Sequence, residues 1–359
     1  MHILKIVLLV LIGVILFGLI IFFHELGHFL TAKLFKIRVN EFAMGMGPTL
    51  FKFQRGETQY SLKLFPIGGY CAMEGEDEES DVTGAFGTKP VWQRMIVVVA
   101  GAVMNILFGI VLMFAVTVQR DTFLTTQIGG FMENSALQEA GLQEGDIFTR
   151  IDGYKIHTDR DLTFALGLAD PASVDIEVKR GGETLRFDDI RMQSLEEQAD
   201  GRKIVRLDFK VYGAPKTAGL VLSHSVSDTF SMVRMVVETL KGMLTGRFGL
   251  NEIAGPIGTA QVITQAAGEG LKLGFGSAVN NILMMIVLIT VNLGVVNLLP
   301  IPALDGGRFL FLLVELIIRR PVPAKYEGAI HAAGFVLLMG FTIFIAANDI
   351  HRIVTGSGF

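Results

Sequence analysis

The sequence predicts a polytopic α-helical membrane protein of about four transmembrane helices, with a membrane-associated β-hairpin region and one inserted α+β domain. Three observations support this fold class. The chain of 359 residues is 51% hydrophobic and only 18% charged, which is more apolar than ordinary soluble enzymes are. Its apolar residues gather in long runs of the length that crosses a bilayer. Between the second and third runs, the composition becomes that of a soluble domain.

Charge, cysteine content and the N-terminus narrow the class further. A net charge of −4 gives no reason to expect a nucleic-acid partner, whereas the apolar runs require a lipid bilayer. Cys71 is the only cysteine, so an intramolecular disulfide is impossible. The first apolar run has a weakly positive flank and no small-residue cleavage site behind it. It is therefore expected to be a retained transmembrane helix rather than a signal peptide.

The first predicted span, residues 4–32, carries an H-E-x-x-H motif in its second half. On a helix, His24 and His28 lie four residues apart on one face and can direct two imidazoles at one Zn²⁺ ion. Glu25 stands beside the first histidine, where a carboxylate can accept a proton from a water held by the metal. An ordinary polar helix end is the alternative, but such residues are costly within apolar sequence and by default mark a functional site.

Basic residues after this span predict its orientation. The positive-inside rule places them in the cytoplasm, so the zinc motif is expected near the cytoplasmic face with the N-terminus outside. These residues are Lys33, Lys36, Arg38, Lys52, Arg55 and Lys63.

Residues 39–73 alternate between apolar and polar side chains and predict β-hairpins, with a turn at Arg55-Gly56-Glu57. Non-helical backbone close to a membrane is tolerated where it is buried in protein or lines a water-filled cavity. A strand edge in such a place can pair with an extended peptide. A hairpin on the cytoplasmic surface fits the spacing equally well.

The second predicted span, residues 95–118, is free of charge. Gly101, Ala102 and Gly109 give it a small-residue face suited to close helix packing. Asn105 also lies in this span, where helix packing is the favoured role and catalysis the alternative.

Residues 125–212 form the predicted soluble domain. A short helical stretch precedes A-G-L-x-x-G-D at residues 140–146, and the following strand ends in I-D-G at 151–153. This order resembles a circularly permuted PDZ domain of the bacterial kind. PDZ domains usually receive a peptide by strand addition, and a steric gate is the alternative role.

Residues 213–278 are expected to hold an amphipathic helix and a connecting loop. Apolar side chains recur at helical spacing from Val226 to Leu244, which fits a helix along the membrane surface or one packed on the PDZ-like domain. Residues 253–258 are expected to be a loop beside the third span.

The third predicted span, residues 279–299, ends in N-L-L-P-I-P-A-L-D-G-G at 297–307. Two prolines break the helix and leave Asp305 at the edge of apolar sequence, where it can supply the third metal ligand. A last span covers 329–347. The basic residues between these two spans put Asp305 on the same side as His24 and His28; they are Arg308, Arg319, Arg320 and Lys325. The predicted membrane core is thus split into residues 1–124 and 279–359.

With H-E-L-G-H in the first span and this second motif in the third, the sequence resembles the site-two proteases, which are zinc metalloproteases that cut peptide bonds within the membrane. The resemblance covers nearly the whole chain and is greatest to the bacterial regulator-of-sigma-E protease branch. It implies His24, His28 and Asp305 as zinc ligands and Glu25 as the catalytic glutamate. Asn297 matches an asparagine thought to bind substrate or steady the scissile carbonyl.

The resemblance also implies a setting for the reaction. Gly45-Met46-Gly47 matches a substrate-facing segment of the family's re-entrant β-hairpin. The substrates would be single-span membrane proteins, such as anti-sigma factors or signal-peptide remnants. The protein would reside in a bacterial cell membrane, with its active site near the cytoplasmic face and the PDZ-like domain outside. Some relatives carry two PDZ domains, and this chain has room for one. A mechanism in which two domains jointly exclude uncut substrates is therefore not expected for this chain.

Two other classes of protein compete with a protease. A membrane scaffold presenting its PDZ-like domain to partners would need neither zinc nor Glu25. A transporter with broken helices would be expected to show inverted internal repeats, and the sequence shows none.

Overall fold

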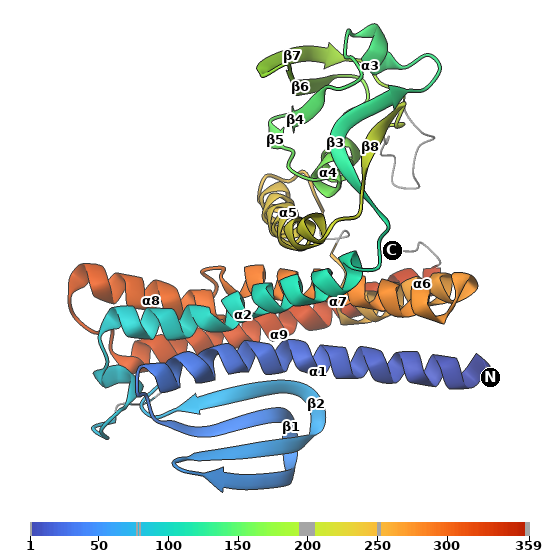
Figure 1. The fold of residues 1–359 in the computed structure, drawn as a ribbon. Coiled ribbons are helices and arrows are strands. Elements are labelled where there is room, and N and C mark those ends of the chain that lie inside the picture. Colours follow the sequence, from blue (N-terminus) through green and yellow to red (C-terminus); the bar gives the residue numbers. More distant parts are fainter. Residues whose placement is uncertain (1, 77, 79, 194–204, 250–252, 356–359) are drawn as a thin grey trace. The chain divides into compact units, whose positions relative to one another are not determined.

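The structure is a computed structural model that describes residues 2–76, 78, 80–193, 205–249 and 253–355. The chain divides into two compact units. One, which we call the membrane unit, combines Met1–Leu112 with Thr239–Phe359. The other, which we call the α/β unit, is Met113–Glu238. Figure 1 shows the helices and strands of both.

Four helices of the described chain are long and apolar enough to cross a membrane. They are α1 (His2–Leu34), α2 (Val91–Thr117), α7 (Phe275–Asn297) and α9 (Ala324–Thr355). Each contains most of one span predicted from the sequence, so the expected set of about four spans is confirmed.

Small residues let these helices approach one another closely. A Cβ atom added to Gly27 of α1 would lie 2.3 Å from the carbonyl oxygen of Ala100 in α2. One added to Gly294 of α7 would lie 3.0 Å from the carbonyl oxygen of Ala102. Since helix backbones reach such distances only where a side chain is missing, these glycines bring α1 and α7 against the same stretch of α2.

The β-hairpin predicted for residues 39–73 is present as β1 (Val39–Arg55) and β2 (Thr58–Met73), with its turn at the expected place. Both strands bend and form four segments. Phe42 pairs with both Tyr60 and Cys71, and Tyr60 also pairs with Phe53, so the order is 49–55, 58–65, 39–46 and 69–73. The last segment pairs on one side only within the described sheet, which makes it an edge.

Two helices of the membrane unit were not predicted, α6 (Pro256–Leu273) and α8 (Asp305–Ile318). The expectation of a loop over residues 253–258 was wrong from Pro256 onward. Its glycine- and threonine-rich sequence resembles a loop, but proline in the first turn and Gly274 just past the end are helix boundary signals. A short 3₁₀ turn, η1 (Phe86–Thr88), precedes α2.

The α/β unit is built on an antiparallel sheet with strand order β7-β6-β4-β3-β8, and a short strand, β5, pairs with β4. Its buried core includes Phe148, Ile151, Leu166 and Ile176. The α+β composition expected for this stretch is therefore observed. Its elements are β3 (Thr122–Phe131), α3 (Ala136–Glu139), β4 (Ile147–Ile151), β5 (Tyr154–Lys155), α4 (Asp159–Leu168), β6 (Val174–Arg180), β7 (Glu183–Ile190), β8 (Phe209–Pro215) and α5 (Ala218–Leu244).

Helix α5 buries its polar face and exposes part of its apolar face. Ser225, Asp228 and Ser231 are fully buried, and Ser231 Oγ lies 2.8 Å from Thr158 Oγ1 at the start of α4. By contrast, Leu222 and Phe230 are exposed by 60% and 46%. The helix thus packs on the α/β unit, as one interpretation expected, and still presents apolar side chains outward, as the membrane-surface interpretation requires.

Candidate metal centre

Three predicted ligand side chains meet inside the membrane unit. The Nε2 atoms of His24 and His28 lie 3.3 Å apart, and Asp305 Oδ2 lies 3.4 Å from the first and 3.5 Å from the second. Ligand bonds of about 2.0–2.1 Å in a tetrahedral zinc site imply ligand-to-ligand distances of about 3.4 Å. Asp305 Oδ2 is buried with no hydrogen-bond partner among the described residues. One zinc ion therefore fits between these three atoms.

The broken helix between α7 and α8 brings Asp305 to this point. Added Cβ atoms at Gly306 and Gly307 would lie 2.2 Å from the Leu299 carbonyl oxygen and 2.4 Å from that of Ile301. Only glycine allows the start of α8 to fold back so tightly onto the preceding loop. The loop is fixed from α9 as well, because the Ala303 backbone N–H donates to His331 Nδ1 at 2.9 Å.

Hydrogen bonds from α2 orient both imidazoles. The Nδ1–H of His28 donates to the Val97 carbonyl oxygen at 2.9 Å, which leaves its Nε2 lone pair free for a metal. His24 Nδ1 lies 3.3 Å from Asn105 Nδ2, and the Oδ1 atom of this fully buried amide has no hydrogen-bond partner among the described residues. Turning the amide by 180° would pair Oδ1 with the Nδ1–H of His24 and free Nε2 in the same way.

An Asn105→Leu variant is expected to bind zinc about 10- to 100-fold more weakly, since His24 loses a side-chain partner that helps to orient its ring. Titration with a competing zinc chelator measures this. Thr290→Val is the matched control, because Thr290 Oγ1 donates to the Asn105 backbone carbonyl and does not contact His24. Equal zinc affinity in Asn105→Leu and the wild type would contradict an orienting role.

Glu25 lines the same cavity of about 420 Å³ as the three ligands. An added Cβ atom at Gly69 would lie 3.2 Å from Glu25 Cγ, so the edge segment 69–73 passes directly beside this carboxylate. Tyr70, Cys71, Ala72 and Met73 from that segment also line the cavity. Burial raises the pKa of the Cys71 thiol, and the nearby Glu76 carboxylate raises it further, so Cys71 stays a neutral thiol at pH 7.

The remaining predicted site residues fall into two groups. Asn297, the last residue of α7, does not line the cavity but contacts one of the ligands, with its Nδ2 at 3.5 Å from His24 Nε2. Gly45, Met46 and Gly47 do not line it. Both glycines have positive φ, 84° and 88°, and an added Cβ atom at Gly45 would lie 2.5 Å from the Phe65 carbonyl oxygen, so their structural use is to bend β1.

Sequence reasoning missed three contributors to this site. Asn105 was identified as a packing residue, and its position in an uncharged span was the available signal for more. His331 lines the cavity, and a histidine within the last predicted span was the signal that could have identified it. Nothing in the local sequence distinguishes residues 70–73 from the rest of the hairpin, because only the fold makes them the edge that faces Glu25.

Comparison with known proteins gives the family. The model of peptidase family M50 matches residues 12–341. A Clostridium perfringens protein that carries the provisional name zinc metalloprotease is 37% identical over 93% of this chain and 96% of its own length. The zinc metalloprotease RasP of Shouchella clausii is 28% identical, over 94% of this chain and 97% of its own. The regulator of sigma-W protease RasP of Bacillus subtilis is 29% identical, over 95% and 97%. The chain therefore belongs to peptidase family M50, the family of the site-two proteases, and is a zinc metalloprotease of the membrane.

Proposed function

We propose that this protease cleaves transmembrane segments of single-span membrane proteins, with His24, His28 and Asp305 as its zinc ligands and Glu25 as its general base. The observation that carries this proposal is the tetrahedral spacing of the three donor atoms. Glu25 shares their cavity, and the helix that holds it is apolar enough to cross a bilayer. A water-consuming reaction placed on such a helix acts on peptide bonds at membrane depth.

The residues of the chain divide the chemistry among them. Bound zinc supplies Lewis-acid chemistry, which polarises the scissile carbonyl and acidifies the attacking water. Glu25 accepts the proton of that water and returns it to the leaving amine. Asn297, whose amide lies 3.5 Å from His24 Nε2, is placed to donate a hydrogen bond to the scissile carbonyl oxygen as negative charge develops there.

The edge segment 69–73 gives the substrate a place to bind. A transmembrane helix hides its peptide bonds in internal hydrogen bonds, so it must unwind before it is cut. An extended peptide can then replace those bonds by pairing with the free edge, beside Glu25. This assigns to residues 69–73 the substrate contact that the sequence suggested for Gly45-Met46-Gly47, which then act by shaping the hairpin.

The ligand assignment is tested by metal content. Purified protein dialysed against a weak chelator is expected to keep about one zinc per chain. The double variant His24→Ala, His28→Ala should lose it together with cleavage of a single-span substrate in proteoliposomes. His351→Ala, which changes an exposed histidine at the end of α9, is the control. Stoichiometric zinc in the double variant would refute the assignment.

The substrates and the orientation follow from the same proposal. A relative is named for regulating sigma-W, so single-span regulators such as anti-sigma factors are the substrates to test first, and signal-peptide remnants second. The basic residues that flank the ligand-bearing helices support a zinc site near the cytoplasmic face of a bacterial cell membrane. The α/β unit then lies outside.

We further propose that the α/β unit is a PDZ-like domain that excludes substrates with bulky outer domains. Its five-stranded path and two helices fit such a domain. The proposed catalytic residues all lie in the other unit, so they do not need it.

Deletion of residues 125–212 tests this gate. Leu124 pairs with Gly213 across β3 and β8, so a short flexible linker can join the cut ends. The deletion variant is expected to cut substrates with a short outer stub at the wild-type rate and also to cut longer substrates that the intact enzyme refuses. A variant that binds zinc but cuts short substrates slowly would instead indicate recruitment of substrate by strand addition.

A further inference from the structure

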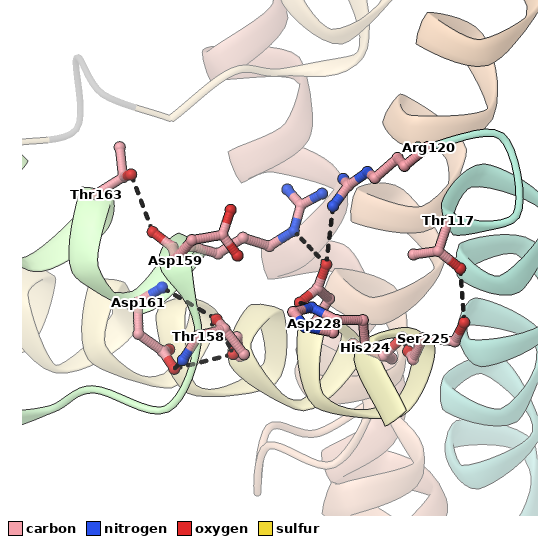
Figure 2. Close-up of polar contacts among 12 residues, drawn as sticks. Thr117, Arg120, Thr158, Asp159, Asp161, Thr163, His224, Ser225 and Asp228 are labelled. Carbon is pink, nitrogen blue, oxygen red and sulfur yellow. Dashed lines mark hydrogen bonds and ion pairs between the residues drawn. The ribbon is translucent and has the colours of Figure 1, made fainter. Parts of the chain in front are cut away.

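A second group of metal-ligand side chains lies within the α/β unit. Asp159 is the first residue of α4, and His224 and Asp228 are four residues apart on α5. One donor atom from each lies within 4.8 Å of the others. Figure 2 shows the three side chains directed toward one another between the two helices. His224 and Asp228 have the same four-residue spacing that places His24 and His28 on one face of α1.

The donor atoms of this group are buried and make no hydrogen bonds within the described chain. Asp159 Oδ1, His224 Nδ1 and Asp228 Oδ1 each lack a hydrogen bond within the described chain. The Asp228 side chain is 0% exposed. Native proteins pair nearly all buried polar atoms, and a single exception calls for an explanation. Three exceptions at one point indicate a ligand that all three would share.

Two arginines pair with the other carboxylate oxygen of Asp228, Oδ2, and do not pair with Oδ1. Asp228 Oδ2 lies 3.1 Å from Arg160 Nε and 3.6 Å from Arg120 Nη1, as Figure 2 shows for Arg120. Both of these ion pairs use Oδ2, and Asp228 Oδ1 lies 3.6 Å from His224 Nδ1.

Two carboxylates therefore meet at one point, those of Asp159 and Asp228. A cation placed between them would offset the repulsion between their charges.

The spacing suits a small divalent ion. His224 Nδ1 and Asp228 Oδ1 are 3.6 Å apart, close to the distance of about 3.4 Å between neighbouring ligands of tetrahedral zinc. This distance is too long for a hydrogen bond between the two atoms. The widest separation in the group, within 4.8 Å, requires one ligand to move inward by roughly 1 Å.

We propose that Asp159, His224 and Asp228 form a second divalent-metal site, separate from His24, His28 and Asp305, which takes a transition-metal ion such as Zn²⁺. One imidazole and two carboxylates are a donor set that this class of ion accepts. The bound ion would join the start of α4 to α5. The two carboxylates are already balanced by two guanidinium groups, so binding here is expected to be weaker than at the first site and to require added metal.

The test measures zinc in the full-length protein in detergent, with and without added zinc. The wild type should take up one further ion per chain, and so should the His24→Ala, His28→Ala variant, which removes the first site from the measurement. Because this background cannot cleave substrate, the result does not depend on the proposed function.

Two variants remove the second site with little change of shape. His224→Phe keeps an aromatic ring against Phe123, whose ring centroid lies 4.7 Å away, and Asp159→Asn keeps the size of the side chain. Each should lose the added ion, while His157→Gln, at an exposed histidine near α4, should keep it. Thermal unfolding in chelator reports folding. In the His24→Ala, His28→Ala background, added zinc should raise the unfolding temperature, and it should no longer do so once His224→Phe or Asp159→Asn is added.

Three results would overturn the proposal. The first is that the wild type takes up no further ion when zinc is added. The second is that both variants still take up the added ion. The third is that added zinc does not raise the unfolding temperature of the His24→Ala, His28→Ala variant.

Discussion

A Glu25→Gln variant is expected to keep its zinc and to lose a hundred- to ten-thousandfold in cleavage rate, the range that general acid–base catalysis contributes. Glutamine has nearly the shape of glutamate, so the cavity beside residues 69–73 should not change. Its amide cannot accept the proton of the attacking water or return one to the leaving amine. Zinc content and single-substrate cleavage rates in proteoliposomes measure the two effects separately.

Glu57→Gln provides the matched control for this variant. Glu57 lies at the hairpin turn and pairs with Lys33 at 2.7 Å, with half of its side chain exposed, so its loss should have little effect on the cleavage rate. A Glu25→Gln enzyme that cuts at the wild-type rate would show that another group is the base. A variant that loses zinc as well would instead assign Glu25 a structural role.

Replacing Gly101 by alanine is expected to weaken zinc binding by about a hundredfold or more, although the change adds one methyl group at a position that binds no metal. An added Cβ atom would lie 2.2 Å from His28 Nε2 and 2.8 Å from His24 Cε1. Non-bonded carbon contacts are favourable only near 3.5 Å, so both imidazoles would have to move. His28 cannot do so without losing its hydrogen bond to Val97.

Gly18→Ala is the control that separates a clash with the imidazoles from the general effect of replacing glycine by alanine in a membrane helix. Gly18 lies on α1, and an added Cβ atom there meets nothing within 4 Å. This control should keep full zinc affinity and activity, since alanine favours a helix over glycine by about 1 kcal/mol. Chelator competition measures affinity, and helix content by circular dichroism shows whether each variant folds. Wild-type affinity in Gly101→Ala would mean that α2 and α1 are farther apart than the structure has them.

The sequence predicted most strongly what depends on local spacing. His24, Glu25 and His28 share a helix turn, and apolar runs of spanning length are visible without a fold. Asp305 was predicted from the proline-broken helix, because a carboxylate at the edge of apolar sequence has few other uses.

What could not be predicted depends on residues far apart in the chain. The contact between Asn105 and His24 joins positions 81 residues apart, and no spacing rule relates them. The substrate contact implied for Gly45-Met46-Gly47 stays a prediction, and the positive φ values give the two glycines a structural use that the sequence alone does not show. Helices α6 and α8 were missed because proline and glycine within or beside them resemble breaks rather than boundaries.

Helix α5 limits where this chain can be divided. Its buried side is polar and its outward side carries Leu222, Val226, Phe230 and Val237. A fragment cut at the ends of the α/β unit would keep its own core and would also carry this apolar stripe into water, where such surfaces promote self-association. A soluble form therefore requires polar replacements along the stripe, since removal of the helix would take Ser231 and Arg234 from Asp161 and Asp228 from Arg160. In most membrane proteins the boundary between apolar and polar surface falls between one segment and the next. In this chain it also runs along the length of a single helix, α5.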